Sequence, residues 1–203
     1  MTVTAIRQDS PDRLSVLFDD GEEIKSTPGA VTALRLFVGR ELDAQALEAF
    51  RLESMRALAR ERALMLVSRR QMSAKELREK LRQKGVDPET AAWCADWLTE
   101  RGLLDEQAYA AAVVRHYAAK GCGAGKVRAE LMRRGVTREL ADAALEAMPD
   151  GQEKLDRLIA ARLKDPGDRD EVRKLSASLY RRGFSAEEIR SALRRVQADF
   201  EEY

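Results

Sequence analysis

Basic side chains gather in one short stretch of this chain of 203 residues. Residues 69–84 hold seven lysine or arginine residues and two acidic ones, a net charge of +5. Within that stretch Lys75, Arg78 and Arg82 stand at i, i+3 and i+7, a spacing that would place them on one face of a helix. Such a face can bind phosphate groups or an acidic protein surface, although many solvated helix faces have the same composition. The candidate binding residues of the stretch are Arg69, Arg70, Lys75, Arg78, Lys80, Arg82 and Lys84.

Two further basic clusters follow at the matching positions of a sequence repeat. The second cluster consists of Lys126, Arg128, Arg133 and Arg134, and the third of Arg173, Lys174, Arg181 and Arg182. If equivalent helices face the same way, the three clusters form a cationic stripe whose contacts weaken as the salt concentration rises. The sequence alone leaves open whether such a stripe contacts DNA or a protein.

Other residue types that could support catalysis are scarce. His116 has no neighbour that suggests a catalytic role and is interpreted as a surface residue or an interface member. Cys94 and Cys122 are isolated from each other and from His116, which argues against a zinc site or a disulfide framework, and Cys94 is expected in a core. Gly121–Val127, the glycine-rich link, lacks the spacing, the hydroxyl residue and the preceding strand of a phosphate-binding loop, so its glycines are interpreted as a flexible connection between helices. We therefore expect no active site, no metal and no cofactor.

The composition favours helices with narrow apolar faces. Charged residues make up 35% of the chain and aromatic residues 5%, so a deep enclosed pocket is not expected. Trp93 and Trp97 are predicted to pack in a core rather than to anchor an interface. Residues 1–53 hold 6 basic and 10 acidic residues and residues 54–104 hold 11 and 7, a change from −4 to +4 that favours a polyanionic partner at one end. No apolar run approaches the roughly 20 residues of a membrane span, and the first residues do not resemble a signal peptide, so we expect a cytoplasmic protein.

The N-terminal residues carry the strand signals of the chain. β-prone segments and a turn at Asp19–Gly21 predict a small antiparallel sheet. Pro28 is expected to begin a short helix that runs to Leu36, and Asp43 to cap the helix that follows. The predicted strands are residues 4–7, 14–18 and 22–25.

From about residue 54 the chain repeats itself around Gly85, Gly135 and Gly183, the hinge glycines. Apolar residues lie four and eight positions before each glycine and six, nine, ten and thirteen positions after it, which is the spacing of two helices. An N-capping residue stands two positions after each glycine, so each glycine is predicted to end one helix in the left-handed conformation. The apolar pairs before the glycines are Leu77 and Leu81, Val127 and Leu131, and Leu175 and Leu179, and the N-caps are Asp87, Thr137 and Ser185.

An earlier apolar helix pattern precedes each of these pairs, so every repeat is predicted to contain three helices. The predicted fold is mainly α, with three tandem three-helix repeats in an elongated curved array after a small N-terminal module that contains β-strands. The expected domains are the module, residues 1–53, and the repeats, residues 54–104, 105–150 and 151–203. We expect a monomer that binds another macromolecule.

Three blocks of residues occur in order at the repeat spacing. The blocks are Ser73–Leu81 with Lys84-Gly85; Gly102–Asp105 with Tyr109-Ala110 and Val114-Arg115; and Arg181–Ser185 with Ile189. Through these blocks the repeats resemble the RecX family, the bacterial regulators of the RecA recombinase, from about residue 60 to about residue 197.

The resemblance implies a regulator without an active site, which acts in DNA repair by homologous recombination and in the SOS response. Such a protein lies in the helical groove of a RecA filament on single-stranded DNA and inhibits filament growth, ATP hydrolysis and strand exchange. Residues 1–53 are similar in layout to an N-terminal extension that some members carry. Two other readings stay open: an independent DNA-binding helical-repeat protein, and a scaffold that binds only proteins through an apolar groove between repeats.

Overall fold

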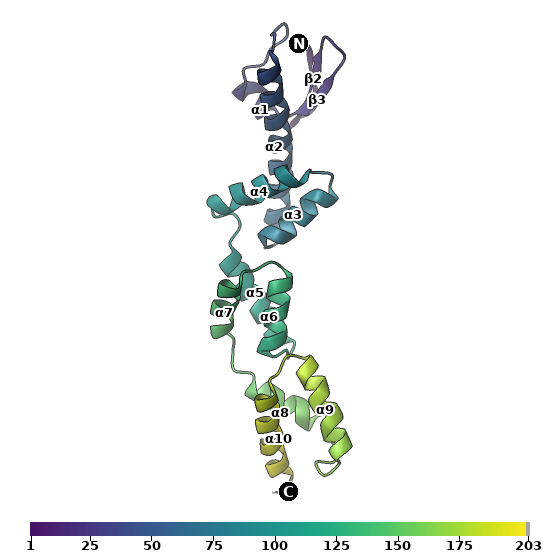
Figure 1. Cartoon of the computed structure of the whole chain (residues 1–203), viewed down its shortest axis with the longest axis vertical. Coiled ribbons are helices and arrows are strands. Elements are labelled where there is room, and N and C mark those ends of the chain that lie inside the picture. Colours follow the sequence, from purple (N-terminus) through teal and green to yellow (C-terminus); the bar gives the residue numbers. More distant parts are fainter. Residues whose placement is uncertain (202–203) are drawn as a thin grey trace. The chain divides into compact units, whose positions relative to one another are not determined.

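Residues 1–201 are described in this computed structural model, with side chains through residue 198. They form three strands and ten helices, in two compact units, Met1–Leu104 and Asp105–Tyr203. The helices of the first unit are α1 (Pro28–Ala33), α2 (Ala44–Arg69), α3 (Ala74–Gln83) and α4 (Pro88–Glu100). Those of the second unit are α5 (Glu106–Ala119), α6 (Ala124–Arg133), α7 (Arg138–Glu146), α8 (Gln152–Ala160), α9 (Arg169–Arg181) and α10 (Ala186–Glu201) (Figure 1).

A three-stranded antiparallel sheet opens the first unit, as the sequence predicts. Its strands pair in the order β1-β2-β3, and the register sets Val16 opposite both Ile6 and Ile24. The turn Asp19–Gly21 joins the second and third strands, with the Gly21 N–H donating to the Phe18 carbonyl at 3.1 Å. The strands are β1 (Val3–Ser10), β2 (Arg13–Phe18) and β3 (Glu23–Ser26).

Helix α1 is shorter than predicted. Thr27 caps its N-terminus, but the helix ends at Ala33 and does not reach Leu36. The reason is Arg35, whose backbone lies in the left-handed region with φ of 53°, so that the chain turns and buries Leu36. The buried residues of this N-terminal core are Val3, Val16, Phe18, Val31, Leu36, Leu42, Leu47 and Phe50.

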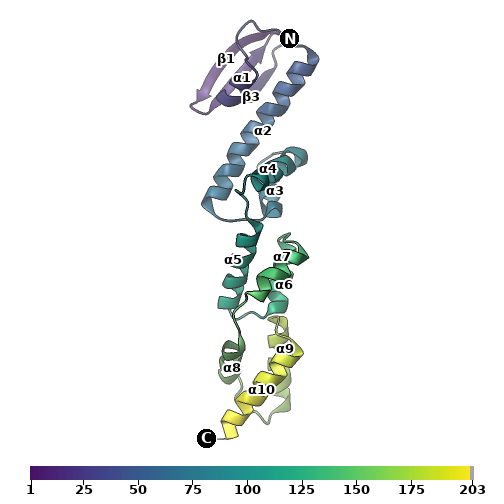
Figure 2. The same ribbon diagram turned by 90° about the vertical axis from the view of Figure 1, so that its left-hand side faces the viewer.

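Helix α2 connects the N-terminal core to the first three-helix core. Its N-terminal part buries Phe50 among the residues of the sheet, and its C-terminal part buries Ala63 against α3 and α4. Both halves belong to one continuous helix, which Figure 2 shows passing from the sheet to α3 and α4. The domain boundary expected between residues 53 and 54 therefore lies inside α2.

Three helices surround each of the remaining apolar cores. The first group is the C-terminal part of α2 with α3 and α4, the second is α5 to α7, and the third is α8 to α10. Gly85, Gly135 and Gly183 have φ angles of 83°, 83° and 89°, which confirms the predicted left-handed helix ends. The predicted N-caps Asp87, Thr137 and Ser185 each accept a hydrogen bond from the backbone N–H three residues later.

The apolar rows on both sides of each hinge fill these cores. Leu77, Leu131 and Leu179, from the helices before the three hinges, are each 0% exposed. Burial of such a leucine stabilises a fold by roughly 1.5–3 kcal/mol, so each group has its own source of stability. The predicted fold class is confirmed: the chain is mainly helical, with a small N-terminal sheet followed by three three-helix groups.

Candidate interface for a polyanionic partner

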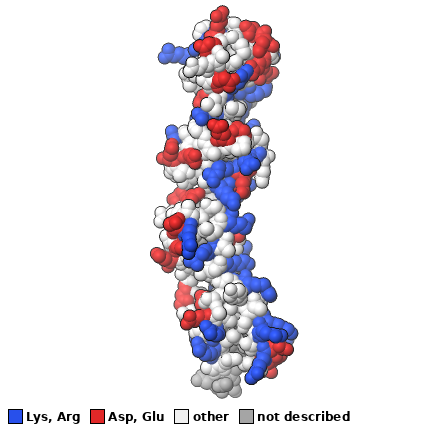
Figure 3. All heavy atoms as spheres, in the orientation of Figure 1, with Lys and Arg blue, Asp and Glu red and all other residues white. Residues whose placement is uncertain are grey.

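The first basic cluster lies on and around α3. Arg78 and Arg82 are on the helix itself, where Arg78 is half-buried and Arg82 exposed. Lys75, in the first turn of the same helix, is exposed. Figure 3 shows lysine and arginine side chains gathered over this helix in the first unit. Arg70, just after α2, is turned toward the start of α3 and pairs with Glu76 at 3.1 Å.

Two other cations of the first cluster meet across the ends of α2 and α3. Arg69 and Lys84 line a hollow of about 380 Å³ together with Arg62, Met65 and Leu66. Sequence reasoning missed Arg62, although it stands seven residues before Arg69 on α2 and hence on the same helix face. Met65 is also exposed to solvent, at 55%. The hollow therefore combines three cations with an apolar floor, a combination suited to an anionic partner that also has apolar groups.

The second basic cluster is partly used inside its own group. Arg133 and Arg134 donate to the same Glu130 carboxylate, each at 2.6 Å, and Arg134 also donates to the Tyr109 hydroxyl at 3.0 Å. The hydrogen bond from Arg133, helped by Arg134, holds the pKa of Glu130 at about 2 against the opposing effect of partial burial. Arg134, whose side chain is 24% exposed, is thus used inside the second group, whereas the Arg133 side chain stays 69% exposed beside Glu130.

The third basic cluster divides between the two ends of α9. Arg173 and Lys174 are exposed near its start, where Arg173 pairs with Asp170 at 3.1 Å. Arg181 ends the helix and is exposed, whereas Arg182 is half-buried. Figure 3 shows basic side chains over α9 as well. The cluster is therefore split between the start of α9, where both cations are exposed, and its end, where one of the two is half-buried.

A backbone contact joins the second and third groups within the second unit. The Gly123 N–H donates to the Arg182 carbonyl at 2.9 Å, and the Gly125 N–H donates to the Gly183 carbonyl at 3.0 Å. The approach is so close that a methyl group on Gly183 would lie 2.1 Å from the Lys126 backbone nitrogen. The glycine-rich link was interpreted as a flexible connection, but the structure gives its glycines another role, since only residues without Cβ atoms fit this contact.

The contact builds a groove from residues of both groups, which we call the joint groove. Lys126 and Arg128 enter it from α6, and Tyr180 and Arg181 from α9. Arg128 also pairs with Asp142 of α7 at 2.8 Å. The groove has a volume of about 700 Å³, and its lining is completed by Ala124, Gly125, Ala129, Gly183, Phe184, Ser185, Ala186 and Glu188.

Tyr180 is the residue of this groove that sequence reasoning missed. Its side chain is 68% exposed, although it stands next to the buried Leu179 in the third core. The sequence signal was weak, because residues that follow one another on a helix can both be buried, as Val113 and Val114 are. The joint groove thus brings together an aromatic ring and members of two predicted basic clusters.

The remaining candidates take structural positions. Trp93 and Trp97 pack against the first core, as predicted, and arginines stack on both rings, with the Arg101 guanidinium 4.0 Å from the centre of the Trp97 ring. Cys94 is buried there, as predicted, and burial raises the pKa of its thiol to about 11. His116 is exposed and meets the Tyr117 ring edge-on, in line with its interpretation as a surface residue.

Comparison with known proteins follows the division into three groups. Family models described as the first, second and third three-helix domains of RecX match residues 59–98, 105–145 and 150–193. The regulatory protein RecX of Xanthomonas axonopodis pv. citri (strain 306) is 42% identical over 137 residues, which cover 66% of this chain and 85% of that protein. The chain belongs to the RecX family. The regulatory protein RecX of Chromohalobacter salexigens is 37% identical over 144 residues, covering 70% of this chain and 95% of the relative.

Solved RecX structures share the fold. A crystal structure of a regulatory protein RecX matches with a TM-score of 0.74 at 23% identity, covering 97% of this chain and 98% of that one. RecX from Lactobacillus salivarius matches with a TM-score of 0.62 at 21% identity, covering 71% of this chain and 97% of that one. The RecX family is one of regulatory proteins and not of enzymes.

Among residues 1–201, no three or more histidine, cysteine, aspartate or glutamate side chains gather in a way that could hold a metal ion. In the same residues, no helix combines the length and the apolar character that crossing a bilayer requires. Each unit has its own candidate surface: the cations and the apolar floor beside Arg69 in the first, and the joint groove with Tyr180 in the second.

Proposed function

We propose that this RecX-family chain regulates a RecA recombinase. It binds the filament that RecA forms on single-stranded DNA and limits filament growth, ATP hydrolysis and strand exchange. The single observation that carries the proposal is the match of all three helical groups to the three RecX domains, in order. The basic residues on α3, α6 and α9 support it, because a nucleoprotein filament presents phosphates and acidic protein surface to such cations.

The first basic cluster is the part of the surface on which we base the test. Arg78 and Arg82 stand one turn apart on α3, and no ion pair with a residue among the described 1–201 occupies either of them. Their helix is anchored by the buried Leu77 and Leu81, so the cations are held on a fixed support. Binding an external anion costs less free energy for a cation without an internal partner than for an arginine that must first leave a carboxylate.

The test is a titration of the purified chain into RecA that hydrolyses ATP on single-stranded DNA. The proposal predicts that hydrolysis slows at sub-stoichiometric or near-stoichiometric ratios of the chain to RecA. No effect across that range would reject it. Tight binding to naked DNA with a steep salt dependence, in the absence of any effect on RecA, would instead identify an independent DNA-binding protein.

Charge reversal locates the surface. The double variant Arg78→Glu/Arg82→Glu should raise the concentration needed for half inhibition by about 10-fold or more, because each reversal turns an attraction of the order of 1 kcal/mol into a repulsion. Its melting temperature should stay near that of the unmodified chain, since Arg82 is exposed, Arg78 is only half-buried, and no ion pair with a described residue depends on either of them.

The matched control is Arg7→Glu/Arg35→Glu, which changes the net charge by the same amount at exposed positions near the N-terminus. It should leave inhibition nearly unchanged. If the two double variants inhibit equally well, α3 is not the contact surface.

A further inference from the structure

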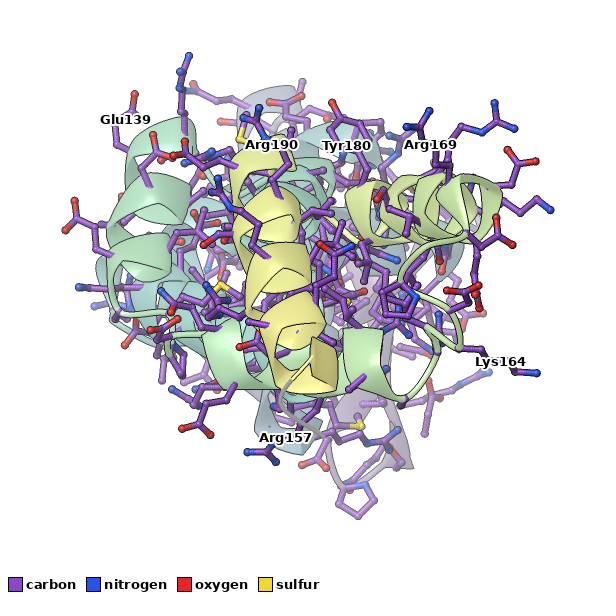
Figure 4. The ribbon with its side chains drawn as sticks, turned by 90° about the horizontal axis from the view of Figure 1, so that it is seen from below. Glu139, Arg157, Lys164, Arg169, Tyr180 and Arg190 are labelled. Carbon is purple, nitrogen blue, oxygen red and sulfur yellow. The ribbon has the colours of Figure 1, made fainter. Side chains whose placement is uncertain are left out.

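Tyr180 occupies an unusual position for an aromatic residue in this chain. Its ring lines the joint groove and also a second hollow of about 480 Å³. Arg190 lines the second hollow as well, and Figure 4 labels both side chains on the neighbouring helices α9 and α10. With 68% of its side chain exposed, the Tyr180 ring offers a surface on which a flat group can stack.

The charged groups around the ring are mostly cationic. Lys126 and Arg181 line the joint groove, and no ion pair with a residue among the described 1–201 involves either of them. Arg128 is already paired with Asp142 of α7 at 2.8 Å. Glu188, the acidic side chain that lines the groove, accepts a hydrogen bond from the Ser185 N–H at 2.6 Å and so caps α10.

The groove is a built feature of the second unit. Its two walls come from segments more than fifty residues apart, α6 and the α9–α10 hinge. The hydrogen bonds from Gly123 and Gly125 to the carbonyls of Arg182 and Gly183 hold those walls together. Cations from both three-helix groups and the Tyr180 ring are therefore positioned by backbone contacts, which makes the arrangement rigid enough to select a ligand.

The geometry points to the joint groove as a direct binding site for single-stranded nucleic acid. An unstacked base lies on the Tyr180 ring, and the phosphates on either side of it contact Lys126, Arg181 and Arg190. The inference deepens the proposed function and rests on it in one respect: the strand it names is the one on which a RecA filament forms.

The chemistry favours a single strand over the other polyanions. In a duplex the bases are stacked on each other, so a ring in a groove cannot reach a base face. An acidic peptide would satisfy the cations but would leave the exposed ring without a role. A single strand uses both features, since stacking on aromatic side chains and contacts to backbone phosphates are the usual basis of its recognition.

The decisive experiment measures binding of the full chain to two fluorescent 12-nucleotide probes by anisotropy. One probe is oligothymidylate, and the other has the same phosphates but abasic sites in place of bases. We expect the chain to bind the thymidylate probe more tightly. Tyr180→Ala should weaken binding of that probe by about 10-fold, as expected for a lost stacking contact, and should remove the preference over the abasic probe.

Three variants complete the test. Tyr180→Phe keeps the ring and should bind as the unmodified chain does. Phe37→Ala removes a ring that is 62% exposed in the first unit, and it should have no effect on either probe. Lys126→Gln/Arg181→Gln should weaken both probes alike and reduce the slope of log K against log salt by about 1.4, that is, by two phosphate contacts on a single strand.

Each outcome decides the inference. Equal binding of the two probes, or a Tyr180→Ala variant that binds thymidylate as before, overturns it. Competition by polyglutamate as strong as by unlabelled thymidylate also overturns it and identifies an acidic protein segment as the ligand. RecA-dependent ATP hydrolysis is measured in parallel with the same variants. A chain that binds thymidylate through Tyr180 but does not affect RecA supports the site and rejects the proposed function. A chain that inhibits RecA but does not bind thymidylate supports the proposed function and rejects the site.

Discussion

Gly183→Ala is the most informative single change, because Gly183 serves both a hinge and a contact between two helical groups. The added methyl group would meet the Lys126 backbone nitrogen at 2.1 Å, the Lys126 Cβ at 2.6 Å and the Gly123 carbonyl oxygen at 2.9 Å. All three distances are far below van der Waals contact, and two of the three atoms belong to the backbone. The α9–α10 hinge and the start of α6 must therefore separate.

The size of the effect follows from two parts. An alanine at φ of 89° costs roughly 1–2 kcal/mol whatever surrounds it. Separation also breaks the two hydrogen bonds from Gly123 and Gly125, each with a net contribution of about 0.5–1.5 kcal/mol. The second unit should therefore lose about 2–5 kcal/mol of its free energy of unfolding.

Gly85→Ala is the matched control. Gly85 occupies the equivalent hinge of the first group with φ of 83°, but a Cβ atom there would meet nothing within 4 Å. This variant should lose only the roughly 1–2 kcal/mol of the backbone conformation. The difference between the two variants isolates the contact between the groups.

Denaturant unfolding provides the assay, with a reporter for each unit. Trp93 and Trp97, the only tryptophans of the chain, lie in the first unit, so their fluorescence reports on that unit alone. Gly183→Ala should leave the fluorescence transition in place and shift the circular dichroism transition of the second unit. Hydrogen exchange should show lost protection in peptides that contain Gly123 and Gly125. Gly85→Ala acts on the first unit, so tryptophan fluorescence reports its effect. An equal loss of unfolding free energy in the second unit for Gly183→Ala and in the first unit for Gly85→Ala, with the Gly123 and Gly125 amides still protected, would refute the contact.

Two further predictions follow from shifted pKa values. Folding lowers the pKa of Glu130 from 4.5 to about 2, so the stability that its carboxylate contributes is complete above about pH 4.5 and is lost as the pH falls toward 2. Glu130→Gln should remove about 1–2 kcal/mol of this pH dependence. The figure is smaller than the full pKa shift implies, because the Arg133 partner is largely solvated. The control Glu153→Gln, at an exposed ion pair, should change the melting profile little. A profile of Glu130→Gln that parallels the unmodified chain between pH 5 and 2 would contradict the first. Burial raises the pKa of Cys94 to about 11, so an aromatic disulfide reagent at pH 8 should titrate the half-buried Cys122 first and Cys94 only in denaturant; two rapid equivalents in the native state would contradict the second.

The features that could be predicted from the sequence are local ones. A glycine that ends a helix, a capping residue two positions later and apolar residues at helical spacing act over at most four turns, so their pattern is read directly from the chain. Leu81, Gly85 and Asp87 take the positions that this pattern assigns to them. The helix end at Ala33 was missed because no residue preference indicates that Arg35 adopts a left-handed backbone.

The features that could not be predicted depend on contacts between distant segments. Gly123 and Gly183 are sixty residues apart, and nothing near either of them indicates that their backbones touch. The role of Tyr180 depends on the same contact, because the ring lies in a groove only when α6 is packed beside the α9–α10 hinge. A glycine-rich stretch therefore indicates freedom of the backbone, whereas close packing of that backbone becomes visible only in the structure.

The three hinges show why a basic composition overstates a binding surface. Each hinge is preceded by cations, but their surroundings differ. In the first group Arg82 stays on the surface. In the second group Arg134 is drawn into an ion pair with Glu130, and its side chain is only 24% exposed. In the third group the backbone of Arg182 joins the preceding group. Because an arginine that already has a half-buried partner loses that partner on turning outward, the same residue type is left available on the surface at one hinge and stabilises the fold at the next.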